Sequence, residues 1–338
     1  MLALEYQIAS VVIIALILYV LFGGADFGGG VWDLFATGPR AKAQRHTISK
    51  AIAPVWETNH IWIILVIVLL FVGFPQAFAA ISTALHIPLT LMLIGIVLRG
   101  SAFAFRSYGI QSSEAQDRWS LVFSISSVIT PITLGMIVGA LTSGTLQKNP
   151  RTGLVQTDFV SSWLAPFPIA LGFFTLTLFS FLAAVYLCLE TTDKDLQEDF
   201  RKRALASGAT VGVMAWICFW LSSTGAPLLR KGLSQSAWSL PFQILTGLVA
   251  VATFVLLWKR KYLLARIFAA GQVTLIMIGW ALAQFPYIII PHWTFKNTAS
   301  PESVLRPIMI TLLIGLVVLI PALWYLFSIF KQDKKSTS

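Results

Sequence analysis

The chain has 338 residues, of which 57% are hydrophobic and 11% are charged, and its formal net charge is +10. Soluble globular proteins carry about 25% charged residues, so this composition excludes an ordinary soluble domain and indicates a protein that lies in lipid. The apolar runs are continuous rather than alternating, which disfavours a transmembrane β-barrel. The sequence therefore predicts an all-α polytopic membrane protein.

Nine segments are apolar over the about 20 residues that a helix needs to cross a bilayer. They are expected at about 8–30, 53–73, 76–98, 120–145, 160–189, 206–224, 238–258, 264–290 and 306–330. The first lacks a preceding basic region and a small-residue cleavage site, so it is interpreted as a retained helix. Gly73–Gln76 (GFPQ) predicts a tight turn that makes the second and third spans an antiparallel hairpin. Glu190–Arg203 is expected to be a solvated surface helix, because it mixes charges of both signs.

Lys and Arg are concentrated in every second connecting segment. The residues at 40–50, 99–118, 194–203, 259–266 and 331–335 hold about three times as many basic side chains as the other connections. By the positive-inside rule this bias places the N-terminus outside and the C-terminus inside. The positive charge is thus explained by topology, and no nucleic-acid partner is needed.

The loops are short, and no sharp internal sequence repeat is visible. Short loops are typical of up-and-down helix bundles. We therefore expect two four-helix bundles and one peripheral helix: residues 1–146, which carry the polar cluster described below, residues 147–291, and residues 292–338 with the ninth helix and a cytoplasmic tail.

Ionisable residues within the spans gather in the first three, and the second group of four has almost none. They are Asp26, Glu57, His60, His86 and Arg99. Each such group costs at least about 2.5–3.5 kcal/mol near the bilayer centre, so these positions carry the functional information. At about 1.5 Å per residue, Asp26 and Glu57 should lie about two turns from the inner surface, and His86 within a turn of His60 in depth.

Several kinds of site were weighed for these residues. Gly24 and Gly28 have the small-xxx-small spacing of close helix packing, and no preceding strand supports a phosphate-binding loop. Glu57-x-x-His60 occurs once, too few for a di-metal centre, and His60 with His86 alone makes a weak haem site. A structural alternative is that Glu57, His60 and Arg99 are hydrogen-bonded, paired or directed to the headgroups. For Arg99 that alternative is favoured, because it is expected at a helix end.

Three motifs together resemble subunit II of the cytochrome bd quinol oxidases, including its cyanide-insensitive relatives. The motifs are GGADFGGGVW, IAPVWETNHIWIILV and LHIPLTLMLIGIVLRGSAFAFR, within residues 23–106, and the nine-span layout extends the resemblance over the whole chain. The family usually has two acids in the first motif, as Asp-Gly-Phe-Asp. This chain has Gly23 at the position of the first acid and keeps only Asp26, which weakens any mechanism that needs both.

The resemblance implies a role in a bacterial plasma membrane complex that oxidises quinol and reduces dioxygen to water with protons from the inside. It implies that haem b and haem d belong to subunit I, and that this chain is haem-free, supports assembly with subunit I and ligates no metal. Some members of the family hold a structural quinone, and a small single-helix subunit is a further expected partner beside lipid.

The resemblance also implies roles for single residues. Glu57 takes the position of the family's proton-path acid, and Asp26 and Arg99 match an acid and an arginine near that path. The remaining expected residues, at the interface with subunit I or in a pocket beside it, are Trp56, Asn59, His60, Trp62 and His86. The alternative is a proton-coupled transporter that uses Asp26, Glu57 and Arg99, which would require a site near mid-bilayer between two comparable halves.

Overall fold

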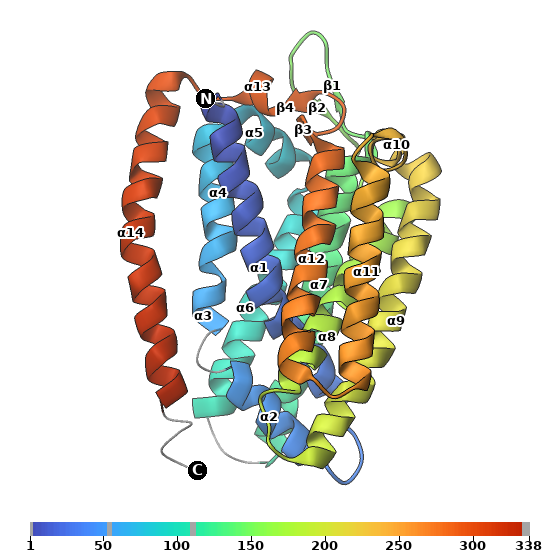
Figure 1. The fold of residues 1–338 in the computed structure, drawn as a ribbon. Coiled ribbons are helices and arrows are strands. Elements are labelled where there is room, and N and C mark those ends of the chain that lie inside the picture. Colours follow the sequence, from blue (N-terminus) through green and yellow to red (C-terminus); the bar gives the residue numbers. More distant parts are fainter. Residues whose placement is uncertain (1–2, 53–55, 109–112, 333–338) are drawn as a thin grey trace.

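Long helices run side by side through most of the described chain, residues 3–52, 56–108 and 113–332, in this computed structural model (Figure 1). In that part, eight helices are long and apolar enough to cross a membrane, or nine if residues 41–52 and 57–73 form one bent span. The eight are α1 (Leu4–Leu34), α6 (His86–Tyr108), α7 (Ser113–Ser143), α8 (Pro166–Leu187), α9 (Lys194–Gly225), α11 (Ser239–Trp258), α12 (Tyr262–Gln284) and α14 (Glu302–Gln332). We call the end of the bundle where α1 begins the upper end, as drawn in Figure 1, and the opposite end the lower end.

Shorter elements complete the chain. At the lower end α2 (Ala41–Ile52) follows α1, and α3 (Trp56–Asn59) leads into α4 (Ile61–Gly73). The upper end carries α5 (Pro75–Ala84), α10 (Pro227–Gln235), α13 (Phe295–Thr298) and two small antiparallel pairs, β1 (Gln147–Lys148) with β2 (Val155–Gln156) and β3 (Tyr287–Ile289) with β4 (Trp293–Thr294). These strands were not expected, and they lie in loops outside the long helices.

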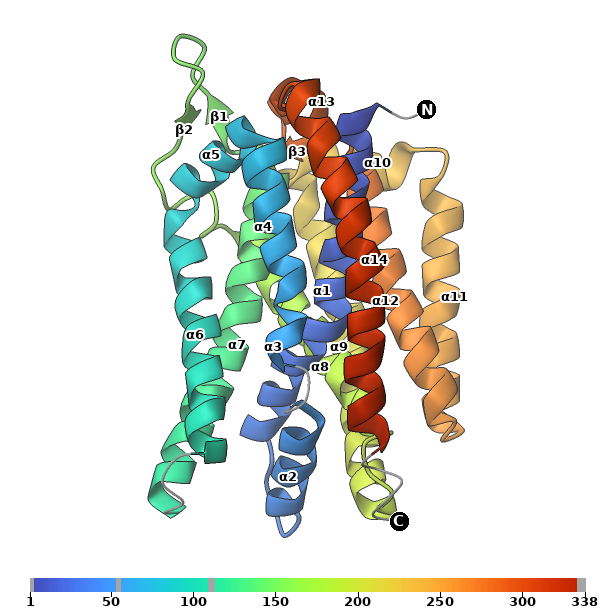
Figure 2. The ribbon, with the colours of Figure 1, turned by 90° about the vertical axis from the view of Figure 1, so that its left-hand side faces the viewer.

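The tight turn predicted between the second and third spans is wrong, although the two spans do run in opposite directions (Figure 2). Pro75 begins a separate ten-residue helix, α5, at the upper end, because proline suits the first turn of a helix but cannot continue the preceding one. The third long helix therefore begins at His86 rather than near residue 76, and it continues to Tyr108. This shift of about ten residues moves Arg99 from the expected helix end into the middle of α6.

Residues 190–203 also differ from the prediction. Instead of a separate surface helix, they contain a turn and then the first turns of α9, which begins at Lys194. The side chain of Asp193 accepts hydrogen bonds from the backbone N–H groups of Asp195 (2.8 Å) and Leu196 (3.1 Å). Such a cap satisfies donors that have no partner within the helix, so the charged stretch starts the helix that follows.

α1 lies at the centre of the bundle and packs against α4, α7 and α8 (Figure 1). Its glycines make this possible: a Cβ on Gly28 would lie 2.0 Å from the backbone oxygen of Phe179 on α8. α14 lies apart at the periphery in Figure 1 and in front of the other helices in Figure 2. Leu305 is the single buried side chain among its described residues. The layout is therefore a packed group of helices with one helix at its edge.

Two connections at the upper end have the same local structure. α4 ends at Gly73 and α9 at Gly225. Each is followed by one non-helical linking residue and then by a proline that starts a short helix. The linking residues have similar dihedral angles, φ −136° and ψ 58° at Phe74 and φ −155° and ψ 64° at Ala226. The order α4–α5–α6–α7 thus recurs as α9–α10–α11–α12, and its sign in the sequence is the tripeptide Gly-x-Pro at both connections.

Candidate functional site

Asp26 is a buried carboxylate on α1, with 7% of its surface exposed. The side-chain amide of Asn59, itself 4% exposed, donates a hydrogen bond to Asp26 Oδ2 at 2.6 Å. Asn59 is the last residue of α3, so the polar residues that precede α4 are folded onto the glycine-rich part of α1. Two residues that are 33 positions apart in the chain therefore form the centre of the site.

The helix tightens at His60, between α3 and α4. The His60 N–H group donates to the carbonyl of Glu57, three residues back, at 3.2 Å, a bond of the 3₁₀ type. The imidazole lies beside the rings of Tyr19 (6.1 Å between centroids) and Phe27 (6.0 Å) on α1. Its Nδ1 atom is buried without a hydrogen-bond partner among the described residues, and so is the hydroxyl of Tyr19.

Arg99 is a buried cation next to this group, with 1% of its surface exposed. The expectation that it lies at a helix end, which favoured a structural role, is wrong, because α6 continues for more than two turns beyond it. Its guanidinium lies over the rings of Phe27 (4.8 Å) and Phe123 (5.1 Å). Its Nε and Nη2 atoms have no hydrogen-bond partner in the described chain, although the charge of Asp26 acts on it. Asp26 and Arg99 therefore interact electrostatically but do not form a closed ion pair.

A second acid and a second arginine lie one layer below, and the sequence analysis missed them as a pair. Arg106 Nη1 lies 3.2 Å from Asp33 Oδ2, and Ser124 Oγ donates to the same oxygen at 3.2 Å. Asp33 is 1% exposed. The signal was present in the spacing, since Asp33 follows Asp26 by seven residues on α1 and Arg106 follows Arg99 by seven on α6. Residues seven apart share a helix face.

Two cavities approach these acids near the lower end. The first, of about 130 Å³, is lined on one side by Asp26 and Asn59 and on the other by Tyr186, Glu190 and Arg266. The second, of about 400 Å³, has Asp33, Asp117, Ser120 and Ser124 in its wall. Polar side chains in the wall of a buried cavity commonly bond ordered water. Water can therefore approach both acids of α1.

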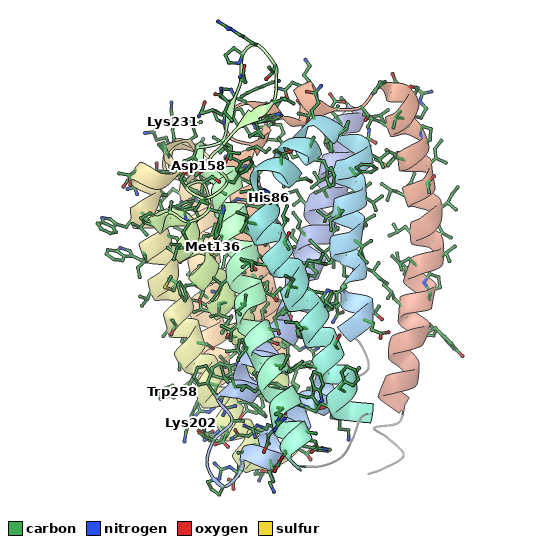
Figure 3. All side chains as sticks on the ribbon, turned by 180° about the vertical axis from the view of Figure 1, so that it is seen from behind. His86, Met136, Asp158, Lys202, Lys231 and Trp258 are labelled. Atoms are coloured by element: carbon green, nitrogen blue, oxygen red, sulfur yellow. The ribbon has the colours of Figure 1, made fainter. Side chains whose placement is uncertain are left out.

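The other predicted residues are spread over the molecule. Glu57 is exposed on α3, and Trp62 is half-buried at the start of α4. His86 begins α6, exposed near the upper end (Figure 3), with its Nδ1 3.0 Å from the carbonyl oxygen of Thr83 and its ring 5.2 Å from that of Phe159. The expectation that it matches His60 in depth is wrong. That estimate treated residues 76–86 as the start of the third span, whereas Pro75–Ala84 form the separate helix α5 at the upper end. The side chain of Trp56 lies outside the described part of the structure.

These side chains do not fit a haem or a metal ion. Among the described residues no group of three or more His, Cys, Asp or Glu side chains could hold a metal. His60 directly precedes α4, whereas His86 begins α6 near the upper end, so the two imidazoles lie far apart. A third cavity, of about 600 Å³, lies between α1, α4 and α12 toward the upper end. Its wall is mostly aliphatic and aromatic, including Ile13, Val66 and Ile278, with Gln284 among the few polar groups. It fits a long apolar molecule.

Comparison with known proteins gives concordant matches. A sequence profile described as cytochrome bd terminal oxidase subunit II matches residues 4–330. Cytochrome bd-I ubiquinol oxidase subunit 2 of Escherichia coli (strain K12) is 21% identical over 319 residues, 85% of this chain and 81% of that protein. Cytochrome bd ubiquinol oxidase subunit 2 of Bacillus subtilis (strain 168) is 26% identical over 182 residues, 54% and 52% of the two chains. A chain in the structure of the bd oxidase from Geobacillus thermodenitrificans superposes with a TM-score of 0.80 at 20% identity, over 97% of this chain and 98% of that one.

Proposed function

Because the chain belongs to the family of cytochrome bd terminal oxidase subunit II, we propose that it is the haem-free subunit and contributes a proton path to the oxidase. As a member of that family it is part of a quinol oxidase complex in the bacterial inner membrane. Haem b and haem d would then be held by subunit I, in keeping with the poor fit of this chain's described side chains to a haem.

The orientation we propose places the lower end in the cytoplasm. The basic residues that the positive-inside rule counts lie at the ends of helices there, such as Arg106 on α6, Lys202 on α9 and Lys259 after α11 (Figure 1). The repeated order of helices supports a division into two four-helix units, residues 1–146 and 147–291, with residues 292–338 as a ninth helix and tail. Assembly with subunit I would cover one face of this bundle.

Asp26 carries the proposal of a proton path. It is buried and interacts electrostatically with Tyr19 and Arg99, and it bonds to Asn59, the chain neighbour of His60. Tyr19, His60 and Arg99 each have a buried polar atom without a hydrogen-bond partner among the described residues. Buried polar atoms are nearly always hydrogen-bonded, to protein or to ordered water. We therefore place a small cluster of water molecules at these atoms, through which a proton could pass between Asp26 and the next acceptor.

Glu57 supports a contact with subunit I. It lies on the same face as Ile61, Ile64 and Val68 of α4, spaced by four, seven and eleven residues, and all four are exposed. A carboxylate is costly against lipid, whereas a partner protein can supply it with hydrogen bonds. We propose that this face, with Trp62 near it, docks on subunit I and delivers the proton path to it at Glu57; Trp56 stays an interface residue expected from the sequence alone. His86, at the other end of the molecule, takes no part in this path.

The transporter alternative is not favoured. Inverted-repeat transporters bind their substrate near mid-bilayer between two comparable halves. Here the buried acids and arginines, Asp26, Asp33, Arg99 and Arg106, all belong to the first four-helix unit and lie toward the lower end.

A structural quinone is a separate expectation, and the 600 Å³ cavity between α1, α4 and α12 favours it. The cavity is apolar for most of its length, with Gln284 and Tyr287 among the lining residues at its upper end. An isoprenoid tail matches such a wall, and the polar residues could bond a quinone oxygen. Extraction of the purified complex followed by mass spectrometry tests whether a quinone is present in addition to the substrate pool.

Substitution of Asp26→Asn tests the proton path. The amide keeps the size of the side chain but cannot carry a proton, so we expect quinol-driven oxygen consumption to fall at least tenfold while the visible haem spectrum stays unchanged. Glu57→Gln should also slow turnover with normal haem content. Wild-type turnover in Asp26→Asn would refute the proposal, and loss of haem in both variants would assign these residues to assembly instead.

A further inference from the structure

The 130 Å³ cavity beside Asp26 opens between elements of both four-helix units. Its far wall comes from the end of α8 and from α12, where Arg266 Nη1 lies 3.8 Å from Glu190 Oε1. The guanidinium also lies over the ring of Tyr186, 4.6 Å from its centroid. Arg266 is thus held by two partners, and the cavity has a charged mouth at the lower end.

The composition of the wall suits a chain of water molecules. At about 30 Å³ per water, the cavity has room for about four. Polar side chains stand at both ends, Asp26 with Asn59 at the buried end and Glu190 with Arg266 at the mouth. The sides between them are apolar, including Ala25 and Ile52, so they bond water weakly and do not trap a proton.

Glu190 and Arg266 line this cavity and are also partly exposed at the lower surface of the molecule. The Glu190 side chain is 22% exposed and that of Arg266 43% exposed, whereas Asp26 is 7% exposed. A carboxylate that is reached by bulk water and also borders the cavity can collect protons from one and pass them to the other. The sequence analysis named Glu190 only as the start of a surface helix and counted Arg266 only as a basic residue of a connection. Neither was expected near Asp26, because they lie about 160 and 240 positions from it in the chain.

On the basis of the proposed function, we propose that protons reach Asp26 through this cavity and that Glu190 is the carboxylate that takes them up at the cytoplasmic mouth. A proton from bulk water binds a carboxylate oxygen of Glu190, leaves it to the nearest cavity water, and a proton arrives at Asp26 at the other end of the water chain. Glu190 returns to its carboxylate form, and no electron moves. Arg266 acts as a positioning residue that keeps the carboxylate at the mouth.

The second cavity does not serve Asp26 in this way. It ends at Asp33, whose carboxylate is already engaged by Arg106 and Ser124. Phe123 lies between the two layers, under the guanidinium groups of both Arg99 and Arg106. The cavity at Glu190 reaches Asp26 itself.

The test uses the intact complex carrying Glu190→Gln. We expect oxygen consumption with quinol to fall at least fivefold, proton uptake measured with a pH-indicator dye to slow by the same factor, and haem content to stay normal. Glu190→Asp, which restores a carboxylate, should recover at least half of the rate. Arg266→Gln breaks the same ion pair but keeps the carboxylate, so it should slow turnover no more than twofold. Glu302→Gln removes an exposed acid at the upper end and should have no effect.

Three results would overturn the inference: normal turnover in Glu190→Gln, equal losses in Glu190→Gln and Arg266→Gln, or no recovery in Glu190→Asp. If Glu190→Gln fails to assemble, Ala51→Phe narrows the cavity without touching the ion pair. It should slow turnover at least fivefold, and normal turnover there would equally reject this route. If Asp26→Asn slows oxygen consumption and Glu190→Gln does not, the proton path through Asp26 stands and only the entrance at Glu190 is rejected. If Asp26→Asn has normal oxygen consumption, both the proton path and the entrance are rejected.

Discussion

The two acids of α1 face two arginines of α6, and their hydrogen bonding differs between the layers. In the lower layer Asp33 and Arg106 form a buried ion pair that Ser124 completes. In the upper layer Asp26 bonds to Asn59 instead, and Arg99 keeps Nε and Nη2 without a partner among the described residues. A closed pair fixes its groups, whereas an open one leaves room for water. This difference supports a structural role for the lower layer and the proposed proton handling for the upper one.

Removal of one partner of the lower pair tests its structural role. Asp33→Ala leaves the largely buried Arg106 without its counter-charge, which typically costs about 3–5 kcal/mol. We expect a clear drop in the thermal unfolding midpoint of the purified complex, and a smaller drop in the double variant Asp33→Ala/Arg106→Met, in which no unpaired charge remains. Glu302→Ala breaks the exposed pair with Arg306, worth about 0–1 kcal/mol, and serves as the control. Equal midpoints for the single and double variants would contradict this role.

At the scale of elements, the sequence predicted the long helices well and their ends poorly. Apolar length defines a span, so α1, α11 and α14 appear close to their expected ranges. Boundaries depend on local bonds that hydropathy does not record, as at Pro75, which starts α5, and at Asp193, which caps α9. The same limit applies to the site. The motifs indicated Asp26 and Arg99, but the depth at which Arg99 is buried depends on where α5 ends and α6 begins.

The cap at Asp193 provides a test of that argument. Asp193→Ala removes the oxygen that accepts from the N–H groups of Asp195 and Leu196, and loss of such a cap costs about 0.5–2 kcal/mol. We expect faster amide hydrogen exchange over the first turn of α9, with little change in α11. The neighbouring substitution Asp195→Ala changes the same charge without removing a cap, since its exposed carboxylate touches only Arg40 at 3.9 Å. Similar exchange in the two variants would show that the cap does not hold this end.

For the whole molecule, the distribution of charge and the position of Asp26 require the same orientation. Glu190 can collect protons for the complex only if the lower end faces the cytoplasm, and the basic residues at that end indicate that side independently. The two lower cavities, the buried acids and the face that carries Glu57 all lie toward this end of the molecule, in the first unit and at its border with the second. The second unit contributes the mouth of the cavity rather than a site of its own.

A pair of matched cysteine substitutions determines this orientation. Lys231 is exposed at the upper end and Lys202 at the lower end (Figure 3), while the native Cys188 and Cys218 are buried, at 0% and 8% exposure. In right-side-out vesicles a membrane-impermeant maleimide should label Lys231→Cys at once and Lys202→Cys only after the membrane is opened. The reverse pattern would place the Glu190 mouth on the outside. Protons for oxygen reduction would then have to reach Asp26 from the opposite side, and the path through this cavity would be excluded.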